Sequence, residues 1–456
     1  MDRSTGNTYN VSKGQNTPGI ARRRFRPYPQ YKDSGVEWLG KIPENWKVRP
    51  LKYVAPLITD RIDGIALEIP YIGLEHIESR TGKMVRAAEY GPSEEQVAEG
   101  LDTRFLSGDV LFGKLRPYLA KVLLSSFDGR CSSEFLVLRS GGEISPAFLA
   151  YQLLSPGFIA WINAMTYGTK MPRASPDQVM STSIAIPDAN EQSAISAFLD
   201  RETAKIDALI EKKERLIELL QEKRTALITQ AVTKGLDPTV PMKDSGIEWL
   251  GKIPAHWEVL SLKRLGIFQA GAGFPDDEQG MVDEDLPFFK VGDLARSKDG
   301  KHLDIAPNSI SKDTAKRLRA YVFPAGTIVF AKVGAALKLN RRRILTRPAC
   351  IDNNMMGFIT DRCDRDWAFC LLCSLDLGEL ANPGAVPSVN EGQAREIQVA
   401  LPPIDEQCAI GSFLDRETAK IDALMSKIRE AITSLREYRT ALISAAVTGK
   451  IDVREG

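Results

Sequence analysis

The chain has 456 residues, of which 43% are hydrophobic and 26% are charged, so it can build apolar cores and fill about three domains of ordinary size. Its 60 basic and 59 acidic residues exclude a uniformly basic nucleic-acid binder, so any DNA affinity must come from local clusters or from a partner. No run of residues is apolar enough to span a membrane, and no secretory signal is evident. The six cysteines are not spaced like those of a disulfide-linked protein, so we expect reduced thiols. We therefore expect a cytoplasmic protein that contacts no membrane.

Several segments of the chain occur twice. Lys32–Pro43 recurs as Lys243–Pro254, with a single change from valine to isoleucine. Phe198–Leu209 recurs without change as Phe413–Leu424. Repeats of this kind indicate a tandem duplication, so we expect two related half-molecules in one chain.

Between the repeated blocks lie two long stretches, 55–185 and 266–400, that barely match. Each stretch nevertheless contains a β-branched strand and a basic turn, then an apolar helix (Ala147–Met165 and Trp367–Leu380), then a strand that ends at proline. We predict two globular domains of one mixed α/β fold with different surface loops. The expected segments are a flexible polar extension (1–30), the first domain (31–187), a long helix (188–237), the second domain (238–402), a second long helix (403–450) and a tail (451–456).

Apolar residues in both helical segments recur at steps of 3, 4 or 7, which is typical of a coiled-coil seam. A helix from Glu191 to Val232 would be about 60 Å long. We expect the two helices to pack together, antiparallel, about a pseudo-twofold axis. The helix residues that we expect to pack or to bind a partner are Phe198, Leu199, Ile206, Leu209, Leu216, Leu220, Phe413, Leu414, Ile421, Leu424 and Leu435.

The pattern of repetition also predicts different binding roles for the helices and the globular domains. Nearly identical helices present one surface twice, so they should dock the same partner twice. Divergent domains present different surfaces, so they should bind different targets. Helices of fixed length between the two domains would fix the distance between them. Such an arrangement suits the recognition of two unlike DNA half-sites at a fixed spacing.

The repeated blocks resemble those of the specificity subunits of type I restriction–modification systems. The residues that carry this resemblance are Lys-Asp-Ser-Gly-x-Glu-Trp-Leu-Gly-Lys-Ile-Pro, Pro187–Gln192 with Pro402–Gln407, and the Phe-Leu-Asp-Arg-Glu-Thr-Ala-Lys-Ile-Asp helix starts. The resemblance covers nearly all of the chain from about Tyr31 onward. It implies that the two globular domains are target-recognition domains, each reading half of a bipartite, asymmetric site in double-stranded DNA.

The same resemblance implies partners and their cofactors. The helices would hold two copies of a modification subunit that binds S-adenosylmethionine and methylates adenine. Up to two motor–nuclease subunits, which use ATP and Mg²⁺, could join the complex. This chain itself would bind no cofactor.

Candidate DNA contacts are basic or aromatic residues in loops that follow predicted strands. In the first domain these are Lys114, Arg116, Tyr118 and Lys121, together with Lys170 and Arg173 of a glycine-containing loop. In the second domain they are Lys332, Lys338, Arg341, Arg342 and Arg343. Which of them touch bases and which touch phosphates stays open.

Catalytic motifs are incomplete in this sequence. The segments that begin at Gly35 and Gly246 fit most of a phosphate-binding loop but have isoleucine where Ser or Thr must bind Mg²⁺. Adenine methyltransferases carry a tetrapeptide, Asn/Asp-Pro-Pro-aromatic, that the sequence lacks, and Cys370-x-x-Cys373 lies in an apolar helix pattern rather than a zinc motif. We expect a non-catalytic chain without a metal site. The alternative is a structural adaptor whose helices and domains bind only proteins.

Overall fold

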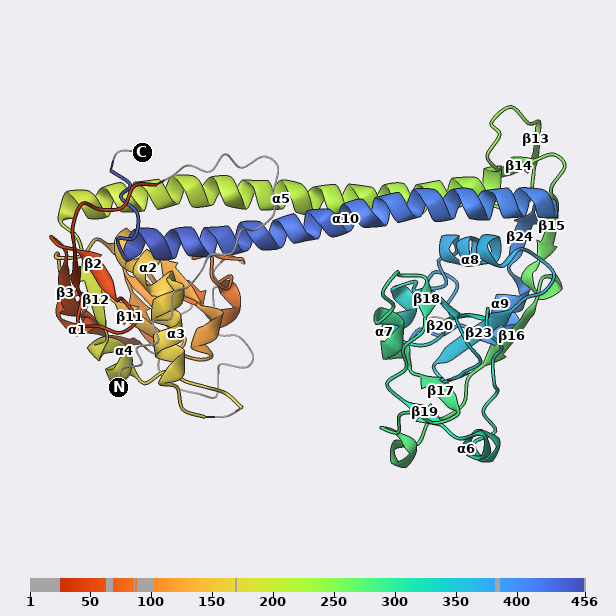
Figure 1. Cartoon of the computed structure of the whole chain (residues 1–456), viewed down its shortest axis with the longest axis horizontal. Coiled ribbons are helices and arrows are strands. Elements are labelled where there is room, and N and C mark those ends of the chain that lie inside the picture. Colours follow the sequence, from red (N-terminus) through yellow and green to blue (C-terminus); the bar gives the residue numbers. More distant parts are fainter. Residues whose placement is uncertain are drawn as a thin grey trace, which may run out of the picture. The chain divides into compact units, whose positions relative to one another are not determined.

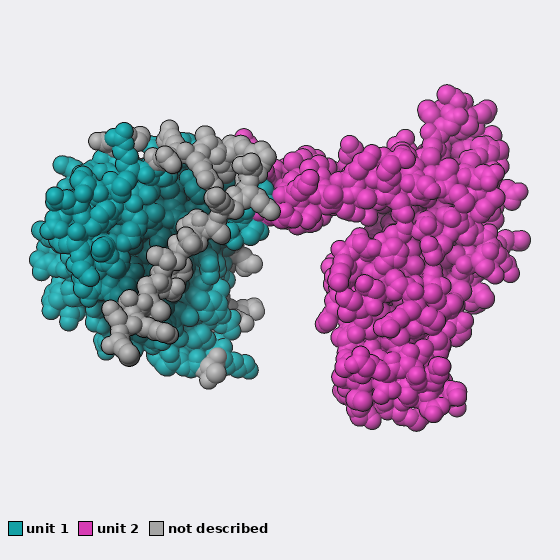
Figure 2. Space-filling view, in the orientation of Figure 1, with its two compact units in different colours: residues 1–211, 431–456 teal, residues 212–430 magenta. Residues whose placement is uncertain are grey.

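The computed structural model describes residues 25–62, 69–85, 87, 102–168, 170–381 and 386–454. The chain divides into two compact units, which are coloured separately in Figure 2. Unit 1 consists of Met1–Glu211 and Ala431–Gly456, and unit 2 of Lys212–Glu430. The division crosses both long helices, α5 (Ala189–Lys234) and α10 (Ile404–Val447), so each unit contains a part of each helix.

Unit 1 contains two four-stranded sheets, with strand orders β5-β7-β10-β6 and β4-β11-β8-β9, besides the pairs β1-β2 and β12-β3. Its strands are β1 (Tyr31–Asp33), β2 (Lys41–Pro43), β3 (Lys47–Pro50), β4 (Leu57–Ile58), β5 (Arg61–Ile62), β6 (Tyr71–Ile72), β7 (Asp102–Phe105), β8 (Val110–Gly113), β9 (Val122–Leu124), β10 (Gly129–Cys131), β11 (Phe135–Leu138) and β12 (Ser183–Ile186). Its shorter helices are α1 (Leu51–Val54), α2 (Pro146–Leu154), α3 (Pro156–Ala164) and α4 (Pro176–Ser181), with 3-10 turns η1 (Leu74–His76) and η3 (Pro117–Leu119). Strands β8 and β11 are buried along their whole length, as their unbroken apolar sequences predict.

Unit 2 contains a five-stranded sheet of order β16-β23-β20-β21-β18 and a three-stranded sheet of order β19-β17-β22, besides the pairs β13-β14 and β15-β24. Its strands are β13 (Met242–Asp244), β14 (Lys252–Pro254), β15 (Glu258–Ser261), β16 (Ile267–Ala270), β17 (Leu286–Phe289), β18 (His302–Leu303), β19 (Ser309–Ile310), β20 (Ile328–Ala331), β21 (Arg342–Leu345), β22 (Cys350–Ile351), β23 (Met355–Ile359) and β24 (Gln398–Leu401). Its shorter helices are α6 (Lys312–Arg317), α7 (Ala335–Lys338), α8 (Arg365–Ser374) and α9 (Glu391–Glu396), with 3-10 turns η4 (Leu262–Arg264), η5 (Asp276–Glu278) and η6 (Val291–Ala295).

The two units repeat one topology even where their sequences differ. The sheet β4-β11-β8-β9 of unit 1 corresponds strand for strand to β16-β23-β20-β21 of unit 2. The parallel pair β6·β10 corresponds to β17·β22, and β3·β12 corresponds to β15·β24 in the same register. The prediction of two domains with one mixed α/β fold is confirmed.

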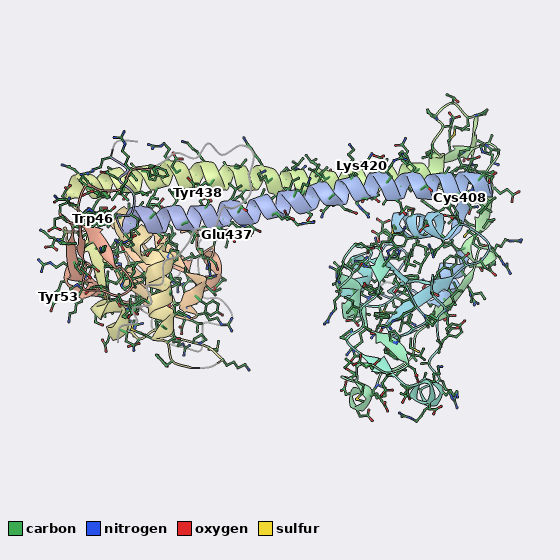
Figure 3. The ribbon with its side chains drawn as sticks, in the orientation of Figure 1. Trp46, Tyr53, Cys408, Lys420, Glu437 and Tyr438 are labelled. Carbon is green, nitrogen blue, oxygen red and sulfur yellow. The ribbon has the colours of Figure 1, made fainter. Side chains whose placement is uncertain are left out.

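Helices α5 and α10 run in opposite directions, since α5 begins in unit 1 and ends in unit 2 whereas α10 does the reverse (Figure 1). In unit 1, Leu199 of α5 and Leu442 of α10 share one apolar core with Trp46, which Figure 3 labels. In unit 2, Val232 of α5 and Leu414 of α10 share the core of that unit. The two long antiparallel helices that the sequence predicts are therefore present, and the apolar core of each unit includes residues of both.

The position of the seam differs from the prediction. Leu209 and Leu216 are 40% and 43% exposed, whereas Ile210 packs on the core of unit 1 and Ile217 is half-buried. On α10, likewise, Leu424 is 46% exposed and the next residue is buried. At these three positions the predicted seam is wrong by one residue, because apolar residues stand side by side there and both fit a step of 3 or 4. Other predicted seam residues, among them Leu199, Ile206 and Leu414, are buried.

Two other boundaries also differ from the prediction. The predicted apolar helix through Leu380 ends at Ser374, and the described residues that follow it, 375–381 and 386–390, form no counterpart of α3. Residues 1–24 of the predicted flexible extension lie outside the described residues. Residues 25–30 are not free, because Tyr28 is 4% exposed in the core of unit 1 and Phe25 meets the ring of Phe198. Among the described residues, no helix combines the length and the apolar character that crossing a membrane requires.

Candidate nucleic-acid interface

Two loops of unit 1 that are distant in sequence are held together by backbone hydrogen bonds. The first, residues 114–121, follows β8, and the second, residues 166–174, precedes α4; together we call them loop pair 1. The N–H of Arg116 donates to the carbonyl of Pro172 at 2.7 Å, and the N–H of Ala174 donates to the carbonyl of Lys114 at 2.9 Å. The candidate residues from both loops therefore lie on one surface.

The exposed side chains of loop pair 1 combine positive charge with aromatic and apolar surface. Arg116 and Lys170 are exposed, and Tyr118 is 40% exposed. Sequence reasoning missed Tyr167 and Met171 beside them, which are 60% and 50% exposed. Cations that neutralise phosphates and flat side chains that contact bases are the usual components of a surface that binds nucleic acid.

Three other candidates in unit 1 are partly buried or make hydrogen bonds within the domain. Arg173 donates a hydrogen bond of 2.8 Å to Glu134, although its side chain remains 44% exposed. Lys114 is half-buried. Lys121 donates to the carbonyl of Leu74, and burial lowers the pKa of its ammonium group. Lys121 thus supports the loop rather than projecting from it.

Unit 2 places the equivalent loops in the same way. Residues 332–341, after β20, and residues 386–390, before α9, form loop pair 2. The N–H of Gly334 donates to the carbonyl of Pro387 at 2.8 Å, and the N–H of Val389 donates to that of Lys332 at 2.9 Å. The exposed side chains here are basic and aliphatic rather than aromatic: Lys338, Leu339 and Arg341. The two loop pairs share a backbone arrangement and differ in what they present.

Arg342 and Arg343 do not belong to this exposed set. The Arg342 side chain is 2% exposed, donates to the carbonyl of Leu375 and to Asn340, and lies over the ring of Phe330. Burial lowers its pKa to about 10. The prediction that Arg342 lies at a DNA surface is wrong, because its position on β21 directs this side chain into the domain interior. Arg343 is half-buried and donates to the backbone of its neighbour, so Arg341 is the exposed member of the triplet.

The helix candidates fall into a buried and an exposed group. Most are buried or half-buried and hold the helices to their units, namely Phe198, Leu199, Ile206, Leu220, Phe413, Leu414, Ile421 and Leu435. The exposed members are Leu209, Leu216 and Leu424, and Leu219 is also 46% exposed. Figure 3 labels other outward residues of α10, Lys420 in unit 2 and Glu437 and Tyr438 in unit 1. Only the exposed group is available for contact with another protein.

The Pro-x-x-x-Glu-Gln segments have a structural role. Gln192 Nε2 donates to the carbonyl of Pro187 at 3.0 Å, and its Oε1 accepts from the N–H of Ser145, the cap of α2, at 2.6 Å. Gln407 makes the same two contacts, to the carbonyl of Pro402 and from the N–H of Asp364, the cap of α8, each at 2.8 Å. Each glutamine thus joins the start of a long helix to the start of a domain helix.

Sequence reasoning also missed a short turn that occurs in both divergent domains, at Ser79–Lys83 and Ser297–Lys301. Each has the pattern Ser-x-x-Gly-Lys. The lysine of each turn reaches the helix pair of its own unit: Lys83 lies 2.7 Å from Asp207, and Lys301 lies 2.6 Å from Asp415. The available signal was this five-residue pattern, which stands at equivalent positions of the two domains.

The environment of the second lysine is strongly polar. Burial alone would lower the pKa of Lys301, but its hydrogen bonds to Asp366 and Asp415 outweigh burial and raise it. Burial would raise the pKa of Asp366, and its hydrogen bond to Lys301 instead holds that pKa below its ordinary value. Both shifts favour the charged forms, so the ion pair is maintained at neutral pH.

Comparisons with known proteins agree with this architecture. Residues 254–434 match the family described as the type I restriction modification DNA specificity domain. The EcoDI specificity subunit of Escherichia coli is 29% identical over 175 residues, which span 37% of this chain and 38% of that relative's length. The MjaVIII specificity subunit of Methanocaldococcus jannaschii is 23% identical over 441 residues, which cover 91% of this chain and 95% of the relative.

A solved structure described as "Structural basis underlying complex assembly and conformational transition of the type I R-M system" has the same fold. Its TM-score is 0.66 at 22% identity, and the match covers 90% of this chain and 99% of that one. These relatives are named as specificity subunits, not as methyltransferase or nuclease subunits, in agreement with a non-catalytic chain. Residues 254–434 thus match a type I restriction–modification DNA specificity domain, and nine-tenths of the chain is similar in sequence to a type I specificity subunit.

Proposed function

We propose that each target-recognition domain reads one half of a bipartite, asymmetric sequence in double-stranded DNA through its loop pair. The observation that carries this proposal is that one loop arrangement occurs twice with different exposed side chains. One backbone arrangement would place each surface on the DNA in a similar way, whereas different side chains would select different bases. Arg116, Tyr118, Lys170 and Arg173 would act in the first domain, and Lys332, Lys338 and Arg341 in the second.

We also infer that the exposed residues of α5 and α10 dock two copies of a modification methyltransferase subunit, which supplies S-adenosylmethionine and the methyl transfer. Leu209 and Leu424 are equivalent positions of the repeat, and both are exposed to a similar extent. An apolar side chain that is exposed at the same place twice fits a partner that binds twice. Motor–nuclease subunits would then use ATP and Mg²⁺ in a larger complex, and a cytoplasmic location follows from the DNA that the complex would act on.

The decisive experiment is to co-express the chain with its methyltransferase partner in a host without adenine methylation and to map methylated adenines by single-molecule sequencing. We expect one motif with two unlike halves and a gap of fixed length. An Arg116→Ala/Lys170→Ala variant should weaken modification, and its DNA affinity should depend less steeply on salt, because fewer phosphate counterions are released. Arg342→Met is the matched control, since that arginine is buried and should leave DNA affinity unchanged.

A complex that is soluble and binds S-adenosylmethionine but modifies no DNA would contradict the proposal. It would favour the alternative in which the chain is a protein-binding adaptor.

A further inference from the structure

The turn Ser79–Lys83 of unit 1 meets both long helices through a cluster of charges. Lys83 Nζ lies 2.7 Å from Asp207 Oδ2 on α5. Arg439 Nε, on α10, donates a hydrogen bond of 2.9 Å to Asp207 Oδ1. The same guanidinium donates from Nη1 to the carbonyl of Arg80 and from Nη2 to the carbonyl of Thr81, each at 3.0 Å. One arginine thus joins a turn of the recognition domain to the helix pair.

This contact is enclosed and its geometry is restricted. The Arg439 side chain is 6% exposed and that of Asp207 is 18% exposed. Arg80 has a φ of +67°, in the left-handed region that residues other than glycine rarely adopt. Its own N–H donates to the carbonyl of Ala120 at 3.1 Å, which ties the turn to loop pair 1. A shift of the domain along the helices would break these contacts together.

The equivalent turn of unit 2 meets the helices at a different point. Lys301 Nζ lies 2.6 Å from Asp415 on α10 and 2.8 Å from Asp366 on α8. Asp415 precedes Asp422, the repeat equivalent of Asp207, by two helical turns, or about 10 Å. The two domains therefore use the same turn but attach it at non-equivalent positions of the repeated helices.

The ion pair of unit 2 that corresponds to Arg439 and Asp207 is formed by Arg224 and Asp422, and among the described residues it makes no hydrogen bond to a turn of the domain. Arg224 Nε donates to Asp422 Oδ1 at 3.1 Å, and within the described part of the chain Asp422 is its sole polar partner. The Arg224 side chain is 31% exposed and that of Asp422 is 40% exposed. The duplication thus supplies a natural control, with the same two residue types in the same helix positions.

We propose that the two lysine turns are joints that fix the position of each recognition domain along the helix pair and thereby set the spacing between the two DNA half-sites. Lys83, Asp207 and Arg439 are positioning residues for the first half-site, and Lys301, Asp366 and Asp415 are positioning residues for the second. The inference rests on the proposed function, because spacing matters only when both domains read DNA.

Physical chemistry favours polar joints for this role. Apolar surfaces of a helix accept several registers at similar cost, whereas a buried charge requires its own partner and so selects one register. A guanidinium with its donors directed at a carboxylate and two carbonyls is also directional. The cores would hold each domain against the helices, and the joints would decide where along them it sits.

The test uses the full complex with its methyltransferase partner. Methylation rates are measured on duplexes that carry both half-sites separated by the native gap, by one base pair less and by one base pair more. For Arg439→Gln we expect discrimination against the altered gaps to fall by on the order of tenfold, while both half-site sequences stay the same. Arg224→Gln is the matched control and should keep the wild-type gap profile. Lys301→Met should relax the profile as Arg439→Gln does.

The outcomes separate this inference from the function on which it rests. A folded Arg439→Gln complex that is active on the native gap and keeps the wild-type gap profile would overturn the joint. If that variant does not fold, Lys83→Met tests the same joint at an ion pair whose lysine is 53% exposed, and an unchanged profile there overturns it equally. A wild-type complex that reads no bipartite sequence would instead overturn the proposed function, and the joint with it.

Discussion

Units 1 and 2 place nearly identical segments in different surroundings. The hairpin β1-β2 carries Trp38, which packs on Gly157 and meets the ring of Phe158 at 5.9 Å, whereas the hairpin β13-β14 carries Trp249, which is 41% exposed. Figure 1 shows the second hairpin projecting past α5, away from α8. The difference arises because α3 lies next to the hairpin of unit 1, whereas the described residues of unit 2 include no such helix between α8 and α9. A repeated sequence thus fixes a local conformation, while its neighbours decide what that segment contributes to stability.

The largest expected difference between the units concerns one core position. Val122 of unit 1 and Arg342 of unit 2 occupy the same place opposite the central strand, and both are buried. Val122→Arg should destabilise unit 1 by more than about 3 kcal/mol, because the new charge would have no prepared partners. Arg342→Met should change the free energy of unfolding of unit 2 by about 1.5 kcal/mol or less, since a buried cation can be replaced by an apolar side chain of similar volume. Hydrogen exchange measured for separate segments gives the stability change caused by each substitution. Equal losses of stability in the two units would contradict the expected difference.

The next comparison pairs the two interhelical arginines. Arg439→Ala should lower the stability of unit 1 by about 2–4 kcal/mol, because it leaves Asp207 and two carbonyls without a buried donor. Arg224→Ala should cost unit 2 about 1 kcal/mol or less, because its ion pair is exposed to water. Local unfolding followed by hydrogen exchange in each unit would distinguish them. A similar cost at both positions would show that the enclosed contacts of Arg439 add nothing.

A smaller difference is expected at the two hairpin tryptophans. Trp38→Ala should cost about 1–3 kcal/mol, through lost apolar burial and the lost edge-to-face contact with Phe158. Trp249→Ala should change stability by about 0.5 kcal/mol or less, because the side chain is already largely in water. Tryptophan fluorescence offers an independent check, since Trp249 should be quenched by iodide far more than Trp38. Equal quenching would contradict the difference in packing.

The smallest expected effect is the pH dependence of unit 2. Since the folded pKa of Asp366 lies below its unfolded value, its contribution is fully present above about pH 3.9 and is lost as the pH falls through the folded pKa. We expect that contribution to be about 1 kcal/mol or less, because the carboxylate is partly exposed. Comparing wild type with Lys301→Met between pH 7 and pH 3 isolates it, since the variant lacks the cation. Parallel stability curves for the two proteins would contradict this assignment.

The sequence predicted the features that depend on local pattern. Repeated blocks identified the duplication, the 3 and 4 spacing identified both long helices, and the run that ends at Phe112 identified a central strand. The two loops of each pair were also selected from the sequence, although nothing in the sequence showed that backbone hydrogen bonds join them. Whether their residues contact DNA remains a prediction.

The features that sequence reasoning missed depend on contacts between distant residues. Spacing alone favours neither Leu209 nor Ile210 for the seam, and only the folded core, on which Ile210 packs, distinguishes them. Arg342 looked like a surface charge because two arginines flank it, and only its place on β21 shows that it is buried. The joint of Arg439 links residues 359 apart in the chain, for which local pattern carries no signal.

The way the last helix ends has a consequence for synthesis on the ribosome. Lys234 donates to the carbonyl of Leu250, 16 residues away, whereas Lys450, which is shifted by one residue in the repeat, donates to the equivalent carbonyl of Leu39, 411 residues away. Closing the longer loop costs about 3 kcal/mol more in chain entropy. Unit 2 is one continuous segment, so it can fold while the chain is still emerging, but unit 1 must wait for its final segment, from Ala431. Unit 1 is thus completed after unit 2, and a truncation before Ala431 would damage unit 1 although most of its residues precede unit 2.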